Sequence, residues 1–298
     1  MAKATRIRRL ELYKKKLASF WAVYKTNKFG LTGLALLVVF VLMAVLADPI
    51  AWALGYTFDK VHWAVVEIAN ITPTALMLAI LYGTRVSLIV GLAASVGAVG
   101  IGTLVGIVAG YIGGKVDEVL MRIVDFMMTL PGLPLLIVLA AVLRGGAAAL
   151  GLWLMVGVLV ILGWPGTARV VRSQTLSLKE RAFIEAARAV GASDRYILFK
   201  HILPNVMPLV FTSMVLRVPG AILGEANLTF LGLGIDISRN ISWGVILYQA
   251  FNTYGATIII EKPWVPIPPG LAITLLAYAT VLVGYAMDEI LNPRLRAR

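Results

Sequence analysis

The stretch LKERAFIEAARAVGASDRYILFKHILP, from Leu178 to Pro204, is a polar and basic segment between two long apolar runs. Its first part, residues 178–190, consists mostly of strong helix formers. Gly191 is suited to end that helix in a left-handed conformation, and Ser193 or Asp194 can cap a second helix. The stretch therefore predicts a helix, a tight turn and a second helix, followed by a membrane span that starts at the closing proline, which is tolerated in a first helical turn.

Six apolar runs account for most of the rest of the chain. The 298 residues are 60% hydrophobic with a mean hydropathy of +0.89, which is more apolar surface than a soluble core can hide. A run of about 20 apolar residues can cross the bilayer core, and a spanning segment must satisfy its own backbone hydrogen bonds. We predict an all-α polytopic membrane protein whose single transmembrane domain covers residues 31–290. The expected spans are about 31–56, 84–112, 120–143, 152–172, 204–224 and 267–290.

Positive charge outside the apolar runs predicts the orientation of the chain. Residues 1–29 hold nine Lys or Arg and one Glu. By the positive-inside rule this end lies in the cytoplasm, and six spans return the basic tail, residues 291–298, to the same side. The N-terminal segment, residues 1–30, interleaves aromatic and basic residues as an amphipathic helix at lipid headgroups does. The net charge of +12 is therefore explained by the orientation of the chain in a cell membrane and by contact with lipid headgroups, rather than by binding of nucleic acid.

Prolines predict breaks in three of the runs. Asp48-Pro49 is expected to break the first span near its end, and Pro131-Gly132-Leu133-Pro134 and Pro165-Gly166 are expected to kink the third and fourth. Neighbouring helices can satisfy the backbone groups that such breaks leave unpaired. Kinked helices occur both as hinges and in static bundles, so the sequence leaves both interpretations open.

A stripe of small residues follows the second run at four-residue spacing. Its members are Ala98, Gly102, Gly106, Gly110 and Gly114. Such spacing leaves one helix face nearly bare and lets two helix backbones approach closely. The stripe predicts helix packing, either inside this chain or against a partner protein.

The polar segment also carries a recognisable pattern of residues. It resembles the EAA loop of permease subunits in ATP-binding-cassette (ABC) importers, and it departs from that pattern at His201, where the family has Ile. The resemblance implies a type I importer permease fold and a surface that the ATPase subunit contacts. The residues that match the pattern are Glu185, Ala186, Ala187, Gly191, Leu203 and Pro204.

The resemblance extends over about residues 27–296 and indicates the second permease of dipeptide or oligopeptide importers. It implies four kinds of partner, namely a homologous second permease, two ATPase subunits, an extracellular substrate-binding protein and membrane lipid. Short peptides are the expected cargo, with di- or oligosaccharides as the alternative, because residues 67–74 differ from the usual outer segment. The stretches that carry the resemblance are YGTRVSL (82–88), GWPGTAR (163–169), LTFLGLG (228–234) and NPRL (292–295).

Nothing in the sequence indicates covalent chemistry. There is no cysteine and no Gly-x-x-x-x-Gly-Lys-Ser/Thr phosphate loop. His62 and His201 are expected on opposite sides of the membrane. We therefore expect a transporter subunit with no catalytic residue, metal or cofactor of its own, and with ATP and Mg²⁺ bound by the partner subunits.

Two ionisable residues at membrane depth are candidates for the transport pathway. Arg217 is expected in the outer half of the fifth span and Glu225 just beyond that span. Ionisable groups in a membrane are rare and usually functional, which favours a role in the pathway. The alternative is that the two residues form a structural pair. An ion-coupled secondary carrier is the distant rival, but its inverted repeats or buried carboxylate chain are not found in the sequence. The ordered 178–204 loop disfavours a purely structural scaffold.

Overall fold

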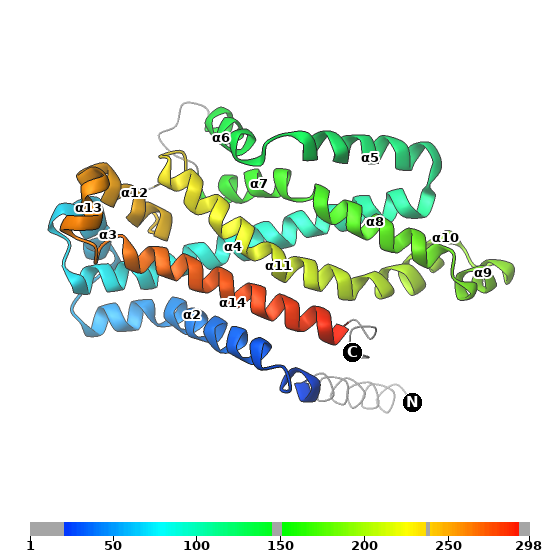
Figure 1. The fold of residues 1–298 in the computed structure, drawn as a ribbon, viewed down its shortest axis with the longest axis horizontal. Helices are drawn as coiled ribbons and strands as arrows, with labels where there is room; N and C mark the ends of the chain where they lie inside the picture. The colour runs from blue at the N-terminus through cyan, green and yellow to red at the C-terminus, as the bar shows by residue number, and fades with distance from the viewer. Residues whose placement is uncertain (1–20, 145–150, 237–238, 292–298) are drawn as a thin grey trace.

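The computed structural model describes residues 21–144, 151–236 and 239–291, which form an elongated bundle of helices (Figure 1). The predictions made for the basic segment 1–30 and the tail 291–298 fall largely outside these ranges. Four helices are each long and apolar enough to cross a membrane. They are α2 (Lys28–Ala53), α4 (Pro73–Ile112), α11 (Leu203–Phe230) and α14 (Ile267–Leu291). Their existence confirms four of the expected spans, although α4 begins well before residue 84.

The other two expected spans are bent pairs of helices. Helix α5 (Gly114–Thr129) meets α6 (Gly132–Leu143) at 94°, and α7 (Leu152–Gly163) meets α8 (Pro165–Lys179) at 46°. The described chain therefore has up to six spans if each pair counts as one. The expected interruption at Pro131–Pro134 is present, and it is a bend of 94° rather than a mild kink. Pro131 has no N–H and forces Leu130 into an extended conformation, which ends α5.

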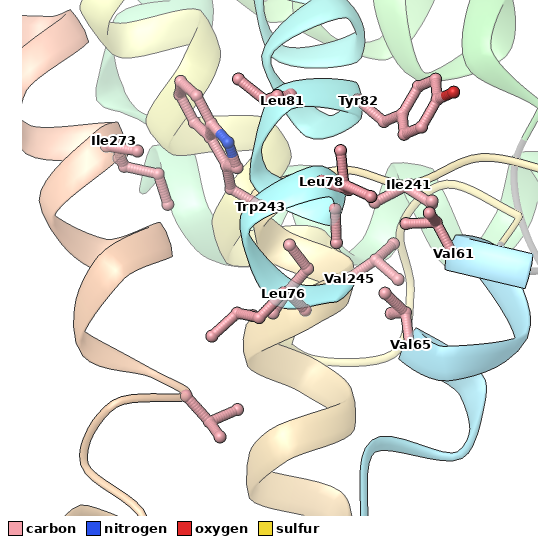
Figure 2. Packing of buried hydrophobic residues seen from close by; sticks show 14 of the residues in the cluster. Val61, Val65, Leu76, Leu78, Leu81, Tyr82, Ile241, Trp243, Val245 and Ile273 are labelled. Carbon is pink, nitrogen blue, oxygen red and sulfur yellow. The ribbon is translucent and has the colours of Figure 1, made fainter. Parts of the chain in front are cut away.

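Short helices form a cap at one end of the bundle, which the sequence did not predict. These are α3 (Phe58–Val66), η1 (Ile68–Asn70), α12 (Trp243–Tyr254), η3 (Gly255–Thr257) and α13 (Ile258–Glu261), and we call them the helical cap. The fully buried Trp243 fixes α12 to α4, since its indole N–H donates to the Ile80 carbonyl at 3.0 Å. Figure 2 shows this core, in which α3, α4, α12 and α14 each contribute apolar side chains.

The glycine stripe of α4 lies against α8 within the same chain. An added Cβ at Gly106 would lie 2.5 Å from the Ala168 carbonyl oxygen, and one at Gly102 would lie 2.6 Å from that of Trp164. Gly110 meets Thr175 in the same way, 2.8 Å from its Cβ. These distances mean that only glycine fits there. Gly114 lies beyond the end of α4 and opens α5, with a φ of +56°.

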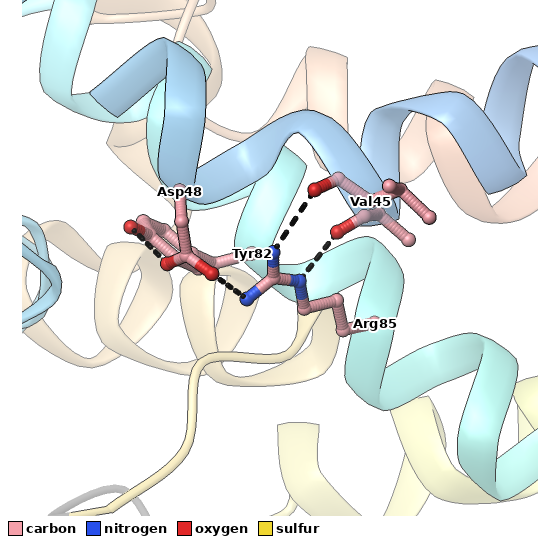
Figure 3. Close-up of polar contacts among 5 residues, drawn as sticks. Val45, Asp48, Tyr82 and Arg85 are labelled. Carbon is pink, nitrogen blue, oxygen red and sulfur yellow. Dashed lines mark hydrogen bonds and ion pairs between the residues drawn. The ribbon is translucent and has the colours of Figure 1, made fainter. Parts of the chain in front are cut away.

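Pro49 lies inside α2, but the expected break is absent. A proline at this position cannot donate to the carbonyl of Val45, four residues earlier. The Arg85 guanidinium of α4 supplies that donor, with Nη2 3.4 Å from the Val45 oxygen and Nε bonded to the Ala44 oxygen (Figure 3). Asp48 then orients the guanidinium through an ion pair at 2.7 Å. The helix continues to Ala53 because a neighbouring helix satisfies the backbone at the proline.

We expect the effect of replacing Arg85 to depend on Pro49. Arg85→Met removes the donors to α2 and leaves a carbonyl unsatisfied, at a cost of about 1–3 kcal/mol of stability. Pro49→Ala restores an N–H that can donate to Val45, so Arg85→Met in that background is expected to cost about 1 kcal/mol less. Thermal unfolding in detergent of the wild type, the two single variants and the double variant measures this coupling. Strictly additive effects would show that Arg85 does not compensate for the proline.

Candidate functional site

The polar segment forms the end of the bundle opposite the helical cap (Figure 1). Its elements are α9 (Ala182–Ala189), α10 (Asp194–Ile197) and the π-helical turn η2 (Leu198–Ile202), which runs directly into α11. The helix expected over 178–190 is shorter, because residues 178–179 finish α8. The extended backbone of Arg181, with φ −82° and ψ 141°, separates α8 from α9 and turns the chain at this point.

The turn between α9 and α10 has the geometry that its sequence predicts. Gly191 has a φ of +83°, a conformation that favours glycine. The Ala192 N–H donates to the Ala187 carbonyl at 3.0 Å, which satisfies an end carbonyl of α9. Of the two candidate caps, Ser193 is the one used, since its hydroxyl accepts from the Tyr196 N–H at 3.4 Å. The turn therefore holds α9 at a fixed angle to α10.

Helix α9 has one anchored face and one exposed face. Ile184 is fully buried in an apolar cluster with Ile197 and Ile202, and Ala187 is partly buried beside it. Glu185 and Ala186 are exposed. Large apolar side chains are also exposed at this end, namely Phe183 (44%), Val190 (85%) and Phe199 (71%). We call the exposed face of α9 with these apolar residues the α9 surface.

Polar contacts between distant segments hold this end together. The Tyr111 hydroxyl, in the last turn of α4, donates to Asp194 at 2.6 Å. The Lys179 ammonium donates to the Tyr111 carbonyl at 2.7 Å, where a cation also complements the helix C-terminus. Arg172 of α8 forms a two-pronged ion pair with Asp117 of α5. None of these contacts is evident in the sequence, because the partners are far apart in the chain.

Leu203 and Pro204 lie at the start of α11. Leu203 is partly buried and Pro204 is exposed in the first turn of the helix. The Asn205 side chain donates to the His201 carbonyl at 2.6 Å. The His201 ring lies between those of Phe183 and Tyr196, with centroids 6.0 and 5.6 Å away. The segment after α10 thus joins the α9 surface to a membrane helix without a flexible link.

Arg217 and Glu225 do not form a pair. Helix α11 continues to Phe230, so Glu225 lies inside it and not beyond it. Glu225 is fully buried, and its Oε1 accepts from Thr229 at 2.9 Å and from Ser242 at 2.7 Å. Arg217 lies at the middle of α11 and not toward its end, and it lines a cavity of about 200 Å³. Glu225 therefore joins α11 to the helical cap, while Arg217 alone faces a cavity.

The described residues contain no group of three or more side chains that could hold a metal ion. His62 lies in α3 in the helical cap and His201 lies beside α10, at opposite ends of the bundle (Figure 1).

Comparisons with known proteins match nearly the whole chain. Residues 102–297 match the family of binding-protein-dependent transport system inner membrane components, and residues 16–65 match the N-terminal transmembrane domain of oligopeptide transport permease C. An oligopeptide transport system permease protein of Haemophilus influenzae is 32% identical over 279 residues, covering 90% of this chain and 85% of that protein. A dipeptide transport system permease protein of Bacillus subtilis is 34% identical over 288 residues, covering 93% and 85%. A glutathione transport system permease protein of Pectobacterium atrosepticum is 37% identical over 218 residues, covering 73% and 69%.

Proposed function

Because this chain belongs to the family of binding-protein-dependent transport system inner membrane components, we propose that it is a permease subunit of an ATP-driven importer of short peptides. The observation that carries the proposal is the α9 surface, a small and exposed helix face on a rigidly held end of the bundle. An exposed helix that is fixed to membrane helices can transmit a movement of a bound partner to them.

The proposed partner at the α9 surface is an ATPase subunit. Ala186 and Ala187 are small enough to let a groove of the partner approach the helix backbone, and the exposed Glu185 is available to pair with a basic residue there. Phe183 and Phe199 add apolar area of the kind that becomes buried in an interface. In this assignment the ATPase subunits bind ATP and Mg²⁺. This chain contributes the translocation path and the helix that transmits movement of the ATPase to it.

Movement of α9 is expected to bias the conformation of the whole permease. The Tyr111–Asp194 contact ties the α9–α10 segment to α4, and η2 ties it to α11. The Lys179–Tyr111 contact in turn ties α4 to α8. Closure of the ATPase subunits around ATP would therefore shift several membrane helices together. This is a population shift between inward-facing and outward-facing states, driven by differential binding.

The names of the relatives support peptide over saccharide as the cargo. Those relatives are named for transport of oligopeptides, dipeptides and glutathione, all of which contain peptide-like bonds. The proposed assembly contains this permease, a homologous second permease, two ATPase subunits and an extracellular binding protein, in a cell membrane. We place both chain termini and the α9 surface in the cytoplasm because of their basic residues.

Reconstitution of the complete transporter tests the proposal. The two permeases, the ATPase subunits and the binding protein are placed in proteoliposomes, and ATP hydrolysis is measured with short peptides and with di- and trisaccharides. We expect the peptides to raise ATPase activity several-fold and the saccharides to leave it unchanged. Stimulation by saccharides alone would overturn the cargo assignment. Failure of any ATPase subunit to co-purify with the permease pair would overturn the importer assignment.

A further inference from the structure

The cavity beside Arg217 lies where four helices meet, next to two helix breaks and a proline inside α11. Its walls come from α4, α6, α7 and α11. Each of three lining glycines stands next to a break or a proline: Gly132 follows Pro131, Gly163 ends α7, and Gly220 follows Pro219. Sites formed by interrupted helices near the middle of the membrane are suited to bind polar parts of a cargo. The cavity has the place and the construction of such a site.

Among the described residues that line this cavity, Arg217 alone is charged. The remaining lining residues are Ala94, Gly132, Leu136, Leu159, Leu162, Gly163, Gly220 and Ala221. In the part of the chain that the structure describes, no acidic side chain forms an ion pair with Arg217. Three other arginines between helices do have carboxylate partners, namely Arg85 with Asp48, Arg169 with Asp125 and Arg172 with Asp117. Arg217 is therefore a cation at membrane depth that has no carboxylate partner among the described residues.

The backbone around Arg217 leaves room for its guanidinium group. An added Cβ at Gly163 would lie 2.7 Å from Nη2 and 2.9 Å from Nε of Arg217. Ala98 closes the other side, because its Cβ would lie 2.8 Å from the same added atom. The guanidinium thus rests against the bare backbone at the end of α7. This contact fixes its position at the bend between α7 and α8.

We infer that Arg217 receives the C-terminal carboxylate of a peptide as the cargo passes through the permease. The guanidinium fork fits a carboxylate through two parallel charge-assisted hydrogen bonds. A cavity of about 200 Å³ holds a carboxylate and a small adjoining group, but not a whole peptide. Every unmodified linear peptide has this carboxylate whatever its side chains, so the contact suits a transporter of varied sequences. The inference rests on the proposed peptide cargo, and it deepens that proposal by naming the group that is bound.

Uptake of matched cargoes by the reconstituted transporter tests this inference. The cargoes are a radiolabelled neutral tripeptide with a free C-terminus and the same tripeptide as its C-terminal amide. Each variant is compared with the wild type for each cargo, so any preference of the binding protein cancels. We expect Arg217→Gln to lower uptake of the free acid at least tenfold and to change uptake of the amide by less than twofold. Uptake of the free acid by Arg217→Lys is expected to lie between that of the wild type and that of Arg217→Gln, because lysine keeps the charge and lacks the guanidinium fork.

One control variant and the behaviour of the wild type separate the failures of the two proposals. Arg122→Gln removes an exposed arginine whose ion pair is with Glu118 on the same helix, and it should leave both cargoes unaffected. If the wild type takes up neither peptide, the proposed peptide function fails. If the wild type takes up the free acid and Arg217→Gln takes it up equally well, the inference alone is overturned. Equal loss of both cargoes together with loss of the second permease on purification would also overturn it, and would assign Arg217 to an ion pair between the two permeases.

Discussion

Gly106→Leu is expected to abolish accumulation of folded protein in the membrane. An added Cβ at this position alone would lie 2.5 Å from the Ala168 carbonyl oxygen and 2.8 Å from the Val171 Cβ. The first of these neighbours is backbone and cannot turn away. Overpacking by single methylene groups costs about 1–3 kcal/mol, and leucine adds four carbons where even one does not fit. The change would force α4 away from α8 along their whole contact.

The matched control for this prediction is on the same helix. An added Cβ at Gly100 meets no atom within 4 Å, so Gly100→Ala and Gly100→Leu test helix propensity without the clash. The Ala and Leu variants at both positions are compared by the yield of monodisperse protein in detergent and by the unfolding temperature. We expect Gly106→Ala to lower the unfolding temperature and Gly100→Ala to leave it equal or higher, since alanine is the better helix former. Equal yields of Gly106→Leu and Gly100→Leu would contradict the packing of α4 on α8.

Ala186→Trp is expected to abolish peptide uptake while the permease still folds. Ala186 is exposed on α9, so the larger side chain has space in this chain. It would stand between the helix and an ATPase groove that the proposal brings into close contact. We expect the amount of ATPase that co-purifies with the permease pair to fall at least tenfold, with no change in the unfolding temperature of the permease itself. Co-purification and uptake in proteoliposomes provide the two readings.

A second alanine-to-tryptophan change provides the control. Ala256 is exposed in the helical cap, at the end of the bundle opposite α9. Ala256→Trp should leave the co-purified ATPase at the wild-type level, because the two ends of the molecule are separate surfaces. Full co-purification and full uptake with Ala186→Trp would show that the α9 surface does not contact the ATPase. Loss of co-purification with both variants would point to a general defect in assembly.

Local sequence signals predicted the elements whose structure depends on local chemistry. The apolar runs identified α2, α4, α11 and α14, because a helix must be long and apolar to cross a bilayer. Gly191 and Ser193 form the expected turn after α9, because a left-handed residue and a helix cap involve only neighbouring backbone groups. The resemblance to importer permeases also came from short stretches, and the family matches confirmed it.

Contacts between distant residues decided the features that the sequence analysis missed. Asp48-Pro49 predicted a break, yet α2 continues because Arg85 of another helix bonds the carbonyls at the proline. Tyr111 and Asp194 are 83 residues apart, and nothing in either local sequence indicates that they meet. The direction of the chain after Pro131 was also not predictable, because a proline signals a break but does not specify a bend of 94°.

The amino-acid sequence alone predicts the membrane class, the main spans, the small-residue stripe and the turn at the α9 surface. Hydrophobic length, helix propensity and capping act within a few residues and can be inferred from the chain alone. Three features became visible only in the folded chain: the stripe packs on α8, Glu225 bonds Ser242 and not Arg217, and Arg217 faces a cavity with no carboxylate partner among the described residues. Each of these depends on which helices lie side by side. An apolar helix in lipid has little local sequence signal for its neighbours, because lipid and another helix are almost equally apolar.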